Sequence, residues 1–329
     1  MKHENPSRIL ITGGREIGGI DSFAEGLRAG FAEFGIPVEI VSPARVFRRW
    51  RDLRNPRVLK ILSTMAVFAA PMARRAICVA HGVPRADAQD WARLLSIIAS
   101  FKLANLCRGA QLVSVSHYTA ATLQAIFNVR SDAVVHNPAK PIYLEGDTGP
   151  PRERCYVTYV GRLKAAKNLH RVLPAIRDVL DETPGLRMCI VGEGEQRAEL
   201  EAMTGGDPRF EFKGTPDDNA VRAWLRRSKV FVSGNQVEGF GIAYLEAMTQ
   251  GCNVVMPACG GGLEIAPELI GRNIFLFSAS FAREAVAAAL RQALLAEPAC
   301  APLNAYRARK TAVGYLAADA CFGNRGERV

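Results

Sequence analysis

Short apolar, β-branched runs alternate along the chain with longer segments whose apolar residues recur every three or four positions. In the first half the short runs read RILIT, PVEIV, AICVA, QLVSV and DAVVH. In the second half they read CYVTYV, LRMCIV, RFEFK, KVFVS, CNVVM and NIFLF. Such alternation is typical of parallel sheets built from strand–helix–strand units. The pattern therefore predicts an α/β fold with two Rossmann-like, doubly wound parallel sheets.

The segments between these runs are predicted to be helices. Phe23, Leu27, Phe31 and Phe34 share one face of a helix that should end at Gly35. The other helices expected from the same reasoning cover about residues 241–250, residues 282–296 and part of residues 303–322.

A proline-rich stretch divides the chain, whose 329 residues exceed the usual size of one domain. Residues 137–154, NPAKPIYLEGDTGPPRER, hold four prolines and two glycines and interrupt the alternation. We expect a Rossmann-like domain over residues 1–145, a second over 150–300, and a helical segment over 301–329 whose packing onto the first domain stays open. Ligands of such sheets bind beyond the carboxyl ends of the strands, so the site should lie in a central cleft that both domains face.

Positive charge is concentrated in one segment of a chain whose formal net charge is +10. Residues 45–60 carry seven basic side chains against one acid, Asp52, and residues 61–73 are mostly apolar. The apolar run is too short to cross a bilayer, which needs about 20 residues. A basic face beside an apolar helix suits anionic lipid headgroups, and it also suits a solvated face beside a core helix, so both interpretations stay open. No nucleic-acid motif accompanies the charge, which argues against a nucleic-acid partner.

The cysteines indicate a reducing environment. The eight are scattered, form no C-x-x-C pair and mostly fall in strand-like runs, as expected for a cytosolic protein. The first residues, MKHENPSRILIT, contain no apolar core of a signal peptide. We therefore expect a cytoplasmic protein and leave open its peripheral attachment to the inner face of the membrane.

Glycines follow the first predicted strand. Gly13, Gly14, Gly18 and Gly19 stand before the first helix, where they would let the backbone approach a ligand at the helix N-terminus. Their spacing is not the G-x-G-x-x-G of dinucleotide-binding proteins, and no acid closes the second strand. A nicotinamide-dependent oxidoreductase is thus disfavoured. A serine hydrolase with a nucleophile elbow is excluded because G-x-S-x-G is absent.

Charged residues follow the strands of the second half. Arg162 and Lys167 come after CYVTYV at the entry to a helix, where two cations would attract a diphosphate. Glu193 stands between two glycines after LRMCIV. Glu238 and Glu246 lie eight positions apart after KVFVS, with Gly-Phe-Gly between them. Glycines beside carboxylates suggest that the backbone approaches a ligand there.

The order of these motifs resembles glycosyltransferase family 4. Over residues 155–265 the chain reads G-R-L-x-x-x-K-N, V-G-E-G, E-G-F-G-x-x-x-L-E-A-M-x-x-G-x-x-V-V and G-G-x-x-E in succession. The resemblance implies the GT-B fold, an E-x7-E motif, retention of the anomeric configuration and no metal or other cofactor. No D-x-D motif that could bind a metal occurs in the chain.

The resemblance also implies a role for each matching position. Glu238 would hold hydroxyls of the donor sugar, Glu246 would accept hydrogen bonds from the ribose, and Arg162 and Lys167 would neutralise the departing diphosphate. His81, at the end of a first-domain strand, would face the donor sugar and completes the expected catalytic set. The remaining residues expected to bind the donor are Gly18, Gly19, Glu193, Gly239, Phe240 and Gly241.

Departures from the family pattern lie mostly outside the donor motifs. Where the family usually reads N-G-[VI]-D at the end of the first domain, only Asn137 matches. Ile274 stands where the family often has glycine. The first domain, which would select the acceptor, is therefore the least typical part.

Together these features predict a glycosyltransferase that moves a hexose or N-acetylhexosamine from a nucleoside diphosphate sugar to a glycan or lipid-linked acceptor. Synthesis of a cell-surface polysaccharide or lipopolysaccharide is the expected setting. Two alternatives remain within the same fold: a sugar-nucleotide epimerase and a binding protein without transfer activity. A Rossmann oxidoreductase is the less favoured third. The motifs leave open the sugar, the nucleotide, the acceptor and the linkage.

Overall fold

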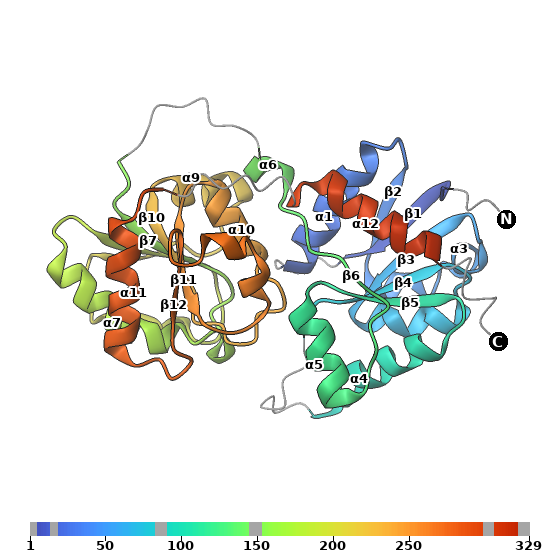
Figure 1. The fold of residues 1–329 in the computed structure, drawn as a ribbon, viewed down its shortest axis with the longest axis horizontal. Coiled ribbons are helices and arrows are strands. Elements are labelled where there is room, and N and C mark those ends of the chain that lie inside the picture. Colours follow the sequence, from blue (N-terminus) through green and yellow to red (C-terminus); the bar gives the residue numbers. More distant parts are fainter. Residues whose placement is uncertain (1–4, 14–18, 83–90, 145–152, 299–305, 322–329) are drawn as a thin grey trace. The chain divides into compact units, whose positions relative to one another are not determined.

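The computed structural model describes residues 5–13, 19–82, 91–144, 153–298 and 306–321 (Figure 1). The chain divides into two compact units, the first formed by Met1–Pro141 with Asn304–Val329 and the second by Ile142–Leu303. Each unit contains a parallel sheet flanked by helices. The α/β fold with two wound parallel sheets is thereby confirmed.

The described part of the first unit contains a six-stranded sheet in the order β2-β1-β3-β4-β5-β6. Its strands are β1 (Arg8–Thr12), β2 (Val38–Val41), β3 (Val58–Ser63), β4 (Ala76–Ala80), β5 (Ala110–Ser114) and β6 (Ala133–Val134). Because β2 lies on one side of β1 and the later strands on the other, the winding reverses between β1 and β3. The carboxyl ends of these two strands therefore flank a switch point, where sheets of this kind bind ligands.

Strand β3 corrects the expectation of a helix after the basic segment. Residues 58–63 form a central strand that is buried throughout, and a 3-10 helix, η1 (Thr64–Met72), follows it. Lys60 is fully buried in this strand, and its ammonium donates to the backbone oxygens of Asn55 at 3.0 Å and Val58 at 2.8 Å. Burial, with a smaller effect of the Arg75 charge, lowers the pKa of Lys60 to about 8. The basic segment thus supplies fewer solvated charges than its composition suggests.

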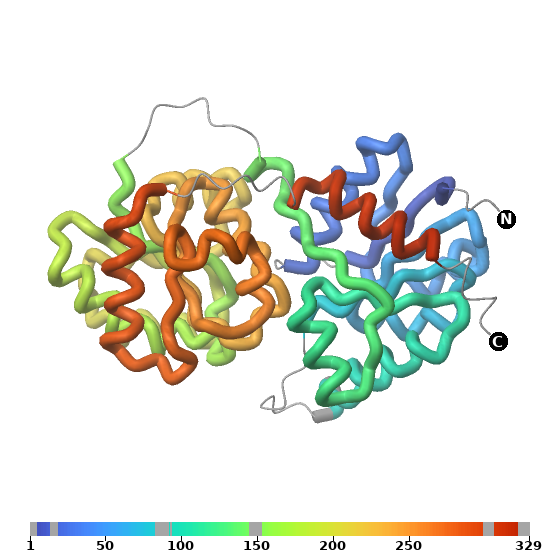
Figure 2. The backbone as a smooth tube through the Cα atoms, in the orientation of Figure 1, coloured from blue at the N-terminus to red at the C-terminus, as the bar shows by residue number. Residues whose placement is uncertain are grey.

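The last helix of the chain packs in the first unit. The helices of this unit are α1 (Gly19–Ala32), α2 (Pro43–Val46), α3 (Trp50–Arg54), α4 (Trp91–Leu106), α5 (His117–Phe127) and α12 (Ala308–Ala320), and α6 (Pro141–Leu144) contains the boundary between the units. Figure 2 shows α12, in red, beside the blue α1. A Cβ atom at Gly30 of α1 would lie 2.2 Å from the backbone oxygen of Ala308. Glycine at position 30 therefore permits this close helix contact.

The described part of the second unit contains a six-stranded parallel sheet in the order β12-β11-β10-β7-β8-β9. Its strands are β7 (Tyr156–Val160), β8 (Arg187–Val191), β9 (Phe210–Phe212), β10 (Ser228–Val232), β11 (Asn253–Pro257) and β12 (Ile274–Phe277). Each corresponds to a run predicted from the sequence. The winding reverses between β7 and β10, so the loops after these two strands flank the switch point of this sheet.

Helices cover this second sheet with apolar faces. They are α7 (Leu169–Glu182), α8 (Arg197–Thr204), α9 (Asp218–Arg226), α10 (Ile242–Thr249) and α11 (Arg283–Leu295), with the 3-10 turns η2 (Ala165–Lys167), η3 (Gly261–Glu264) and η4 (Pro267–Leu269). α7 and α11 lie side by side (Figure 1), and their Ile176 and Leu290 are fully buried with Val230 of the sheet. Among the described residues, none of the helices has the length and apolar character needed to cross a bilayer.

Candidate functional site

Two oppositely charged residues meet at the switch point of the second sheet. Lys167 ends η2 after β7, and Glu238 lies in the loop after β10. Lys167 Nζ lies 3.1 Å from Glu238 Oε2, with side chains that are 32% and 23% exposed. The pair is shielded from bulk water but still accessible to a ligand. The structure therefore brings together two of the predicted catalytic residues where a wound sheet binds its ligand.

Asn235 also binds the carboxylate oxygen that Lys167 contacts. Its Nδ2 donates to Glu238 Oε2 at 2.6 Å. Asn235 is 5% exposed, and its backbone N–H donates to Ser233 Oγ at 3.2 Å. That hydroxyl also accepts from the phenol of Tyr244 at 2.8 Å. The orientation of Glu238 is thus set by a buried network that the sequence analysis missed, although an asparagine three residues before the acid was a visible signal.

Opposing effects set the pKa of Glu238. Burial raises this pKa, whereas the charge of Lys167 and hydrogen bonds from Asn235, Lys167 and the backbone of Gly239 lower it. The net pKa lies below the ordinary value. At neutral pH the carboxyl is therefore ionised and can only accept hydrogen bonds.

The phenol of Tyr159 interacts with both Arg162 and the carboxylate of Glu238. Its hydroxyl donates to the backbone oxygen of Arg162 at 2.9 Å. Burial and then the charge of Glu238 raise the pKa of Tyr159, while the charge of Arg162 opposes them. Both charged groups thus act on one phenol. The exposed Arg162 is the second cation that a ligand would meet at this edge of the sheet.

Close backbone packing holds Lys167 opposite the Glu238 loop. Asn168 has a left-handed backbone with φ 54°, which asparagine tolerates better than most residues, and its Nδ2 donates to the backbone oxygen of Gly234 at 3.1 Å. A Cβ atom at Gly234 would lie 2.7 Å from the backbone oxygen of Asn168 and 2.9 Å from that of Lys167. Glycine at position 234 therefore lets the end of β10 approach the end of η2, a requirement that the sequence analysis also missed.

The predicted Gly239–Gly241 loop leads into α10. Gly241 has φ 95°, and a Cβ atom there would lie 2.7 Å from the ring of Tyr244, so both conformation and space require glycine. The side chain of Phe240 is 1% exposed and belongs to the core. The backbone oxygen of Glu238 accepts from the N–H of Gly261 at 2.8 Å. The glycine loop after β11 thereby supports the Glu238 loop.

Glu246 occupies the middle of α10 and is 7% exposed. Its charge adds to the larger effect of burial in raising the pKa of Tyr143. The carboxylate thus lies near the phenol of Tyr143 within the second unit. Its predicted contact with a ribose concerns a ligand and stays a prediction.

The loop around Glu193 has a structural reason for its glycines. Cβ atoms at Gly192 and Gly194 would lie 1.9 Å from the backbone oxygen of Gly161 and 2.3 Å from that of Leu163. Glu193 itself is exposed and forms an ion pair with Arg197 of α8. Its backbone oxygen accepts from the N–H of Leu163 at 2.9 Å. This loop therefore supports the segment after β7 that carries Arg162.

The predicted residues of the first unit lie near the switch point of its sheet. His81 follows β4, its Nε2 lies 2.9 Å from Ser63 Oγ, and its ring stands edge-on to Phe23 at 4.6 Å between centroids. Burial lowers the pKa of His81 to about 4, so the imidazole is neutral at pH 7. Gly19 begins α1, and a Cβ atom there would meet nothing within 4 Å. Gly18 lies outside the described residues.

Solved structures share this fold. WaaG, a glycosyltransferase involved in lipopolysaccharide biosynthesis, aligns with a TM-score of 0.69 and 16% identity over 94% of this chain and 98% of its own. HepE of Anabaena, in complex with UDP and glucose, aligns with a TM-score of 0.66 and 16% identity over 97% of this chain and 98% of its own. These similarities establish the GT-B fold.

Sequence relatives match about half of the chain. The sulfoquinovosyl transferase SQD2 of Arabidopsis thaliana is 30% identical over 164 residues, which cover 49% of this chain and 31% of SQD2. The 2-deoxystreptamine glucosyltransferase of Streptomyces kanamyceticus is 28% identical over 172 residues, 47% of this chain and 44% of that protein. The matches therefore span less than half of either relative. The family model of the glycosyl transferases group 1 matches residues 145–310, just over half of the chain, and the protein belongs to that family.

Proposed function

We propose that the protein is a retaining, family 4 glycosyltransferase that moves a hexose or N-acetylhexosamine from a nucleoside diphosphate sugar to a glycan or lipid-linked acceptor. The observation that carries this proposal is the pair of Lys167 and Glu238, 3.1 Å apart at the switch point of the second sheet. Relatives named as transferases of sugars support it, as does the complex of HepE with UDP and glucose.

The proposed chemistry uses the two charges separately. On donor binding, Lys167 would turn from Glu238 to the diphosphate, and Glu238 would accept hydrogen bonds from sugar hydroxyls. When the bond between the anomeric carbon and the diphosphate oxygen breaks, its electron pair stays on the diphosphate. Lys167, Arg162 and the positive end of α10 would stabilise that charge. The acceptor oxygen would then bond to the anomeric carbon, on the face that the diphosphate leaves, and pass its proton to the departing diphosphate oxygen.

Two further assignments belong to the same proposal. Glu246 would accept hydrogen bonds from the ribose of the donor, and the neutral His81 would assist at the donor sugar. Conservative variants at each position, assayed for the donor KM and for kcat, test these roles: a ribose contact predicts a change mainly in KM. Unchanged values for Glu246→Gln would contradict its assignment.

The proposal includes no metal ion, because Arg162 and Lys167 supply positive charge for the diphosphate. Transfer should therefore proceed at an unchanged rate after dialysis against EDTA. Loss of transfer that Mg²⁺ or Mn²⁺ restores would contradict this part of the proposal and leave the donor site in place.

The acceptor side is proposed to include a membrane-facing surface, formed by α2, α3 and η1. Phe47, Trp50 and Met65 are 42%, 55% and 50% exposed, and Arg51 stacks on Trp50 with its guanidinium carbon 5.3 Å from the ring centroid. Exposed aromatic residues beside arginines favour the interface of an anionic bilayer. Sedimentation with vesicles containing phosphatidylglycerol tests this: binding should fall for Trp50→Ala, and equal binding to neutral vesicles would contradict it.

A donor panel tests the proposed function as a whole. The full chain is incubated with UDP-, GDP- and ADP-hexoses and with UDP-N-acetylhexosamines, and free nucleotide is measured with and without acceptor extracts. The anomeric configuration of the product is then determined by NMR. Transfer with a retained configuration is expected from one donor. Interconversion of donor sugars with the nucleotide still attached would support an epimerase instead, and binding without product would support a protein that lacks transfer activity.

A further inference from the structure

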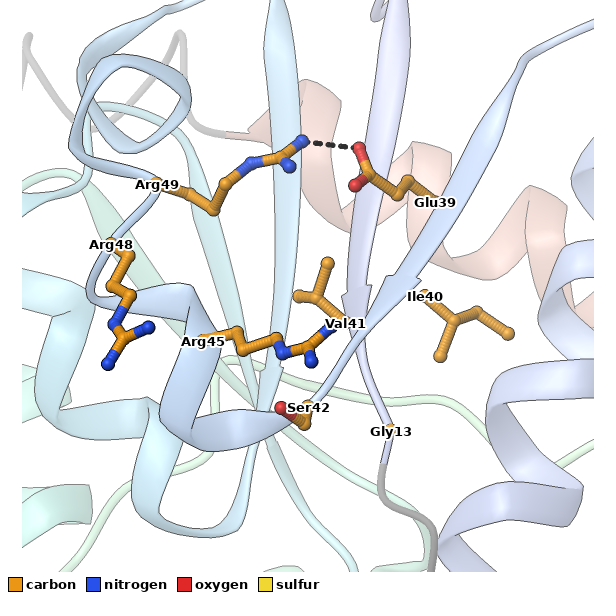
Figure 3. A pocket seen from close by; sticks show the side chains of 8 residues that line it. All are labelled: Gly13, Glu39, Ile40, Val41, Ser42, Arg45, Arg48 and Arg49. Atoms are coloured by element: carbon orange, nitrogen blue, oxygen red, sulfur yellow. Dashed lines mark hydrogen bonds and ion pairs between the residues drawn. The ribbon is translucent and has the colours of Figure 1, made fainter.

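A pocket of about 630 Å³ lies in the first unit, at the carboxyl ends of β1 and β2 (Figure 3). Gly13 and Ser42, the residues that follow these two strands, line it together with side chains of α2 and of the residues just after that helix. This pocket has no role in the donor chemistry proposed above. Its size is that of a small-ligand site, and its place in the sheet is the edge at which wound sheets bind ligands.

One end of the pocket carries charges that neutralise each other. Glu39 of β2 accepts hydrogen bonds from Arg8 at 3.1 Å and Arg49 at 2.5 Å, and Figure 3 shows the Glu39–Arg49 pair. Arg49 also donates to Asp52 at 2.8 Å. The hydrogen bond to Asp52, with smaller effects of Glu39, raises the pKa of Arg49 above its ordinary value. The charges of these two arginines and two acids therefore neutralise one another and leave little net charge for a ligand.

The rest of the pocket carries positive charge for which the described residues supply no counterion. Arg45 and Arg48 are exposed, and neither guanidinium forms an ion pair or side-chain hydrogen bond with any residue that the structure describes. Figure 3 shows Arg45 reaching from α2 toward Val41 and Ser42. A guanidinium only donates hydrogen bonds and matches the planar geometry of carboxylate and phosphate oxygens. A ligand that complements the charge and the hydrogen-bond donors of this part of the pocket is an anion.

We propose that this pocket binds an anionic group, a phosphate or a carboxylate, carried by the sugar acceptor. That the ligand is the sugar acceptor rests on the proposed function, whereas the anion site itself rests on Arg45, Arg48 and the hydroxyl of Ser42. The volume has room for a charged group together with the sugar that bears it. The protein would thus select a charged acceptor over a neutral one of the same shape.

Calorimetric titration of the full chain with monosaccharides tests the pocket. The probes are glucose 6-phosphate and glucuronate, which distinguish phosphate from carboxylate, with glucose as the uncharged reference and saturating UDP present to occupy the proposed donor site. At least one charged probe should bind where glucose does not. The double variant Arg45→Gln/Arg48→Gln should weaken that binding roughly tenfold or more, the effect of losing a charge-assisted hydrogen bond.

The matched control is Arg108→Gln/Arg130→Gln, which removes the same charge from exposed positions of the first unit, outside the pocket and outside the proposed membrane-facing surface. It should leave the affinity for the charged probe unchanged. Equal losses in both double variants would show that general surface charge attracts the anion, and that result would overturn the proposal. Binding of glucose as tightly as the charged probes, or binding of neither charged probe, would also overturn it. UDP binding and nucleotide release, measured on the same preparation, decide the proposed function separately.

Discussion

Replacing Asn235 should impair sugar transfer because this side chain positions Glu238. Its amide donates to Glu238 Oε2 at 2.6 Å, and Lys167 contacts the same oxygen at 3.1 Å. Asn235→Ala removes the first bond and keeps the second. A hydrogen bond to a charged group contributes about 1.5–3 kcal/mol, which corresponds to roughly 10- to 150-fold in an equilibrium. Since Lys167 still holds the oxygen, we expect the lower end, about a tenfold fall in kcat/KM.

Asn235→Asp should be more damaging and should change the pH profile. The new carboxylate would replace a donor with an acceptor 2.6 Å from Glu238 Oε2. Two ionised carboxylates at that separation repel, whereas a proton shared between them restores a hydrogen bond. Transfer by Asn235→Asp should therefore be slower than by Asn235→Ala at pH 8 and should recover in part as the pH falls toward 6. The wild type and Asn235→Ala should show no such recovery.

The assay is nucleotide release from the preferred donor between pH 5.5 and 8.5, with melting temperature as the check on folding. Gln236→Ala is the matched control, since Gln236 lies in the same loop but donates to the backbone oxygen of Ala279 at 2.6 Å. Its kcat/KM should stay within about twofold of wild type, as expected for a change outside the site. Wild-type kinetics for Asn235→Ala, or identical pH profiles for both Asn235 variants, would refute a positioning role.

Three further predictions concern stability. Gly30→Ala should lower the unfolding free energy by about 1–3 kcal/mol, because the new methyl would meet the backbone of Ala308 at 2.2 Å; calorimetry should show no comparable loss for Arg28→Ala. The pKa of His81 is about 4 in the folded protein, against an ordinary value of 6.5, so the unfolded state binds the proton first as the pH falls. The free energy of unfolding should therefore fall between pH 6.5 and pH 4, by up to about 3 kcal/mol. Urea titrations should show a smaller fall for His81→Asn. The pKa of Lys60 is about 8 when folded against 10.5 ordinarily, so Lys60→Met should stabilise the protein below pH 8, by about 1–2 kcal/mol after the lost hydrogen bonds. That gain should shrink between pH 8 and 10.5, and a constant gain would contradict the assignment.

The strands were predictable wherever burial on both faces requires a continuous run of apolar residues. That condition holds for β7, β8 and β10 to β12, and every strand from β7 to β12, including the short Phe-Glu-Phe strand β9, was expected from its sequence. It fails for β3, where Lys60 interrupts the run and a following apolar stretch resembles a helix. The lysine is tolerated only because two backbone oxygens accept its ammonium hydrogens. No local pattern reveals such a pairing.

Part of the candidate site was also predictable. Charged residues at strand ends pointed to Lys167 and Glu238, and the order of the strands brings their two loops together. The supporting contacts were not predictable, because the Asn168–Gly234 bond joins residues 66 positions apart. The pocket around Arg45 was missed for a similar reason: the sequence shows a cluster of arginines, and only the structure shows that Arg49 is neutralised.

The most direct test of the proposed donor site is nucleotide release by Lys167→Ala and Glu238→Ala, measured beside wild type with the preferred donor. The controls, Lys229→Ala and Glu268→Ala, remove exposed charges from the amino end of β10 and from η4. Loss of one charged group at a transfer site typically costs on the order of 100-fold or more in rate. We expect that loss in both site variants, with melting temperatures close to wild type and with active controls. Full activity in either folded site variant would contradict the assignment of Lys167 and Glu238 to catalysis.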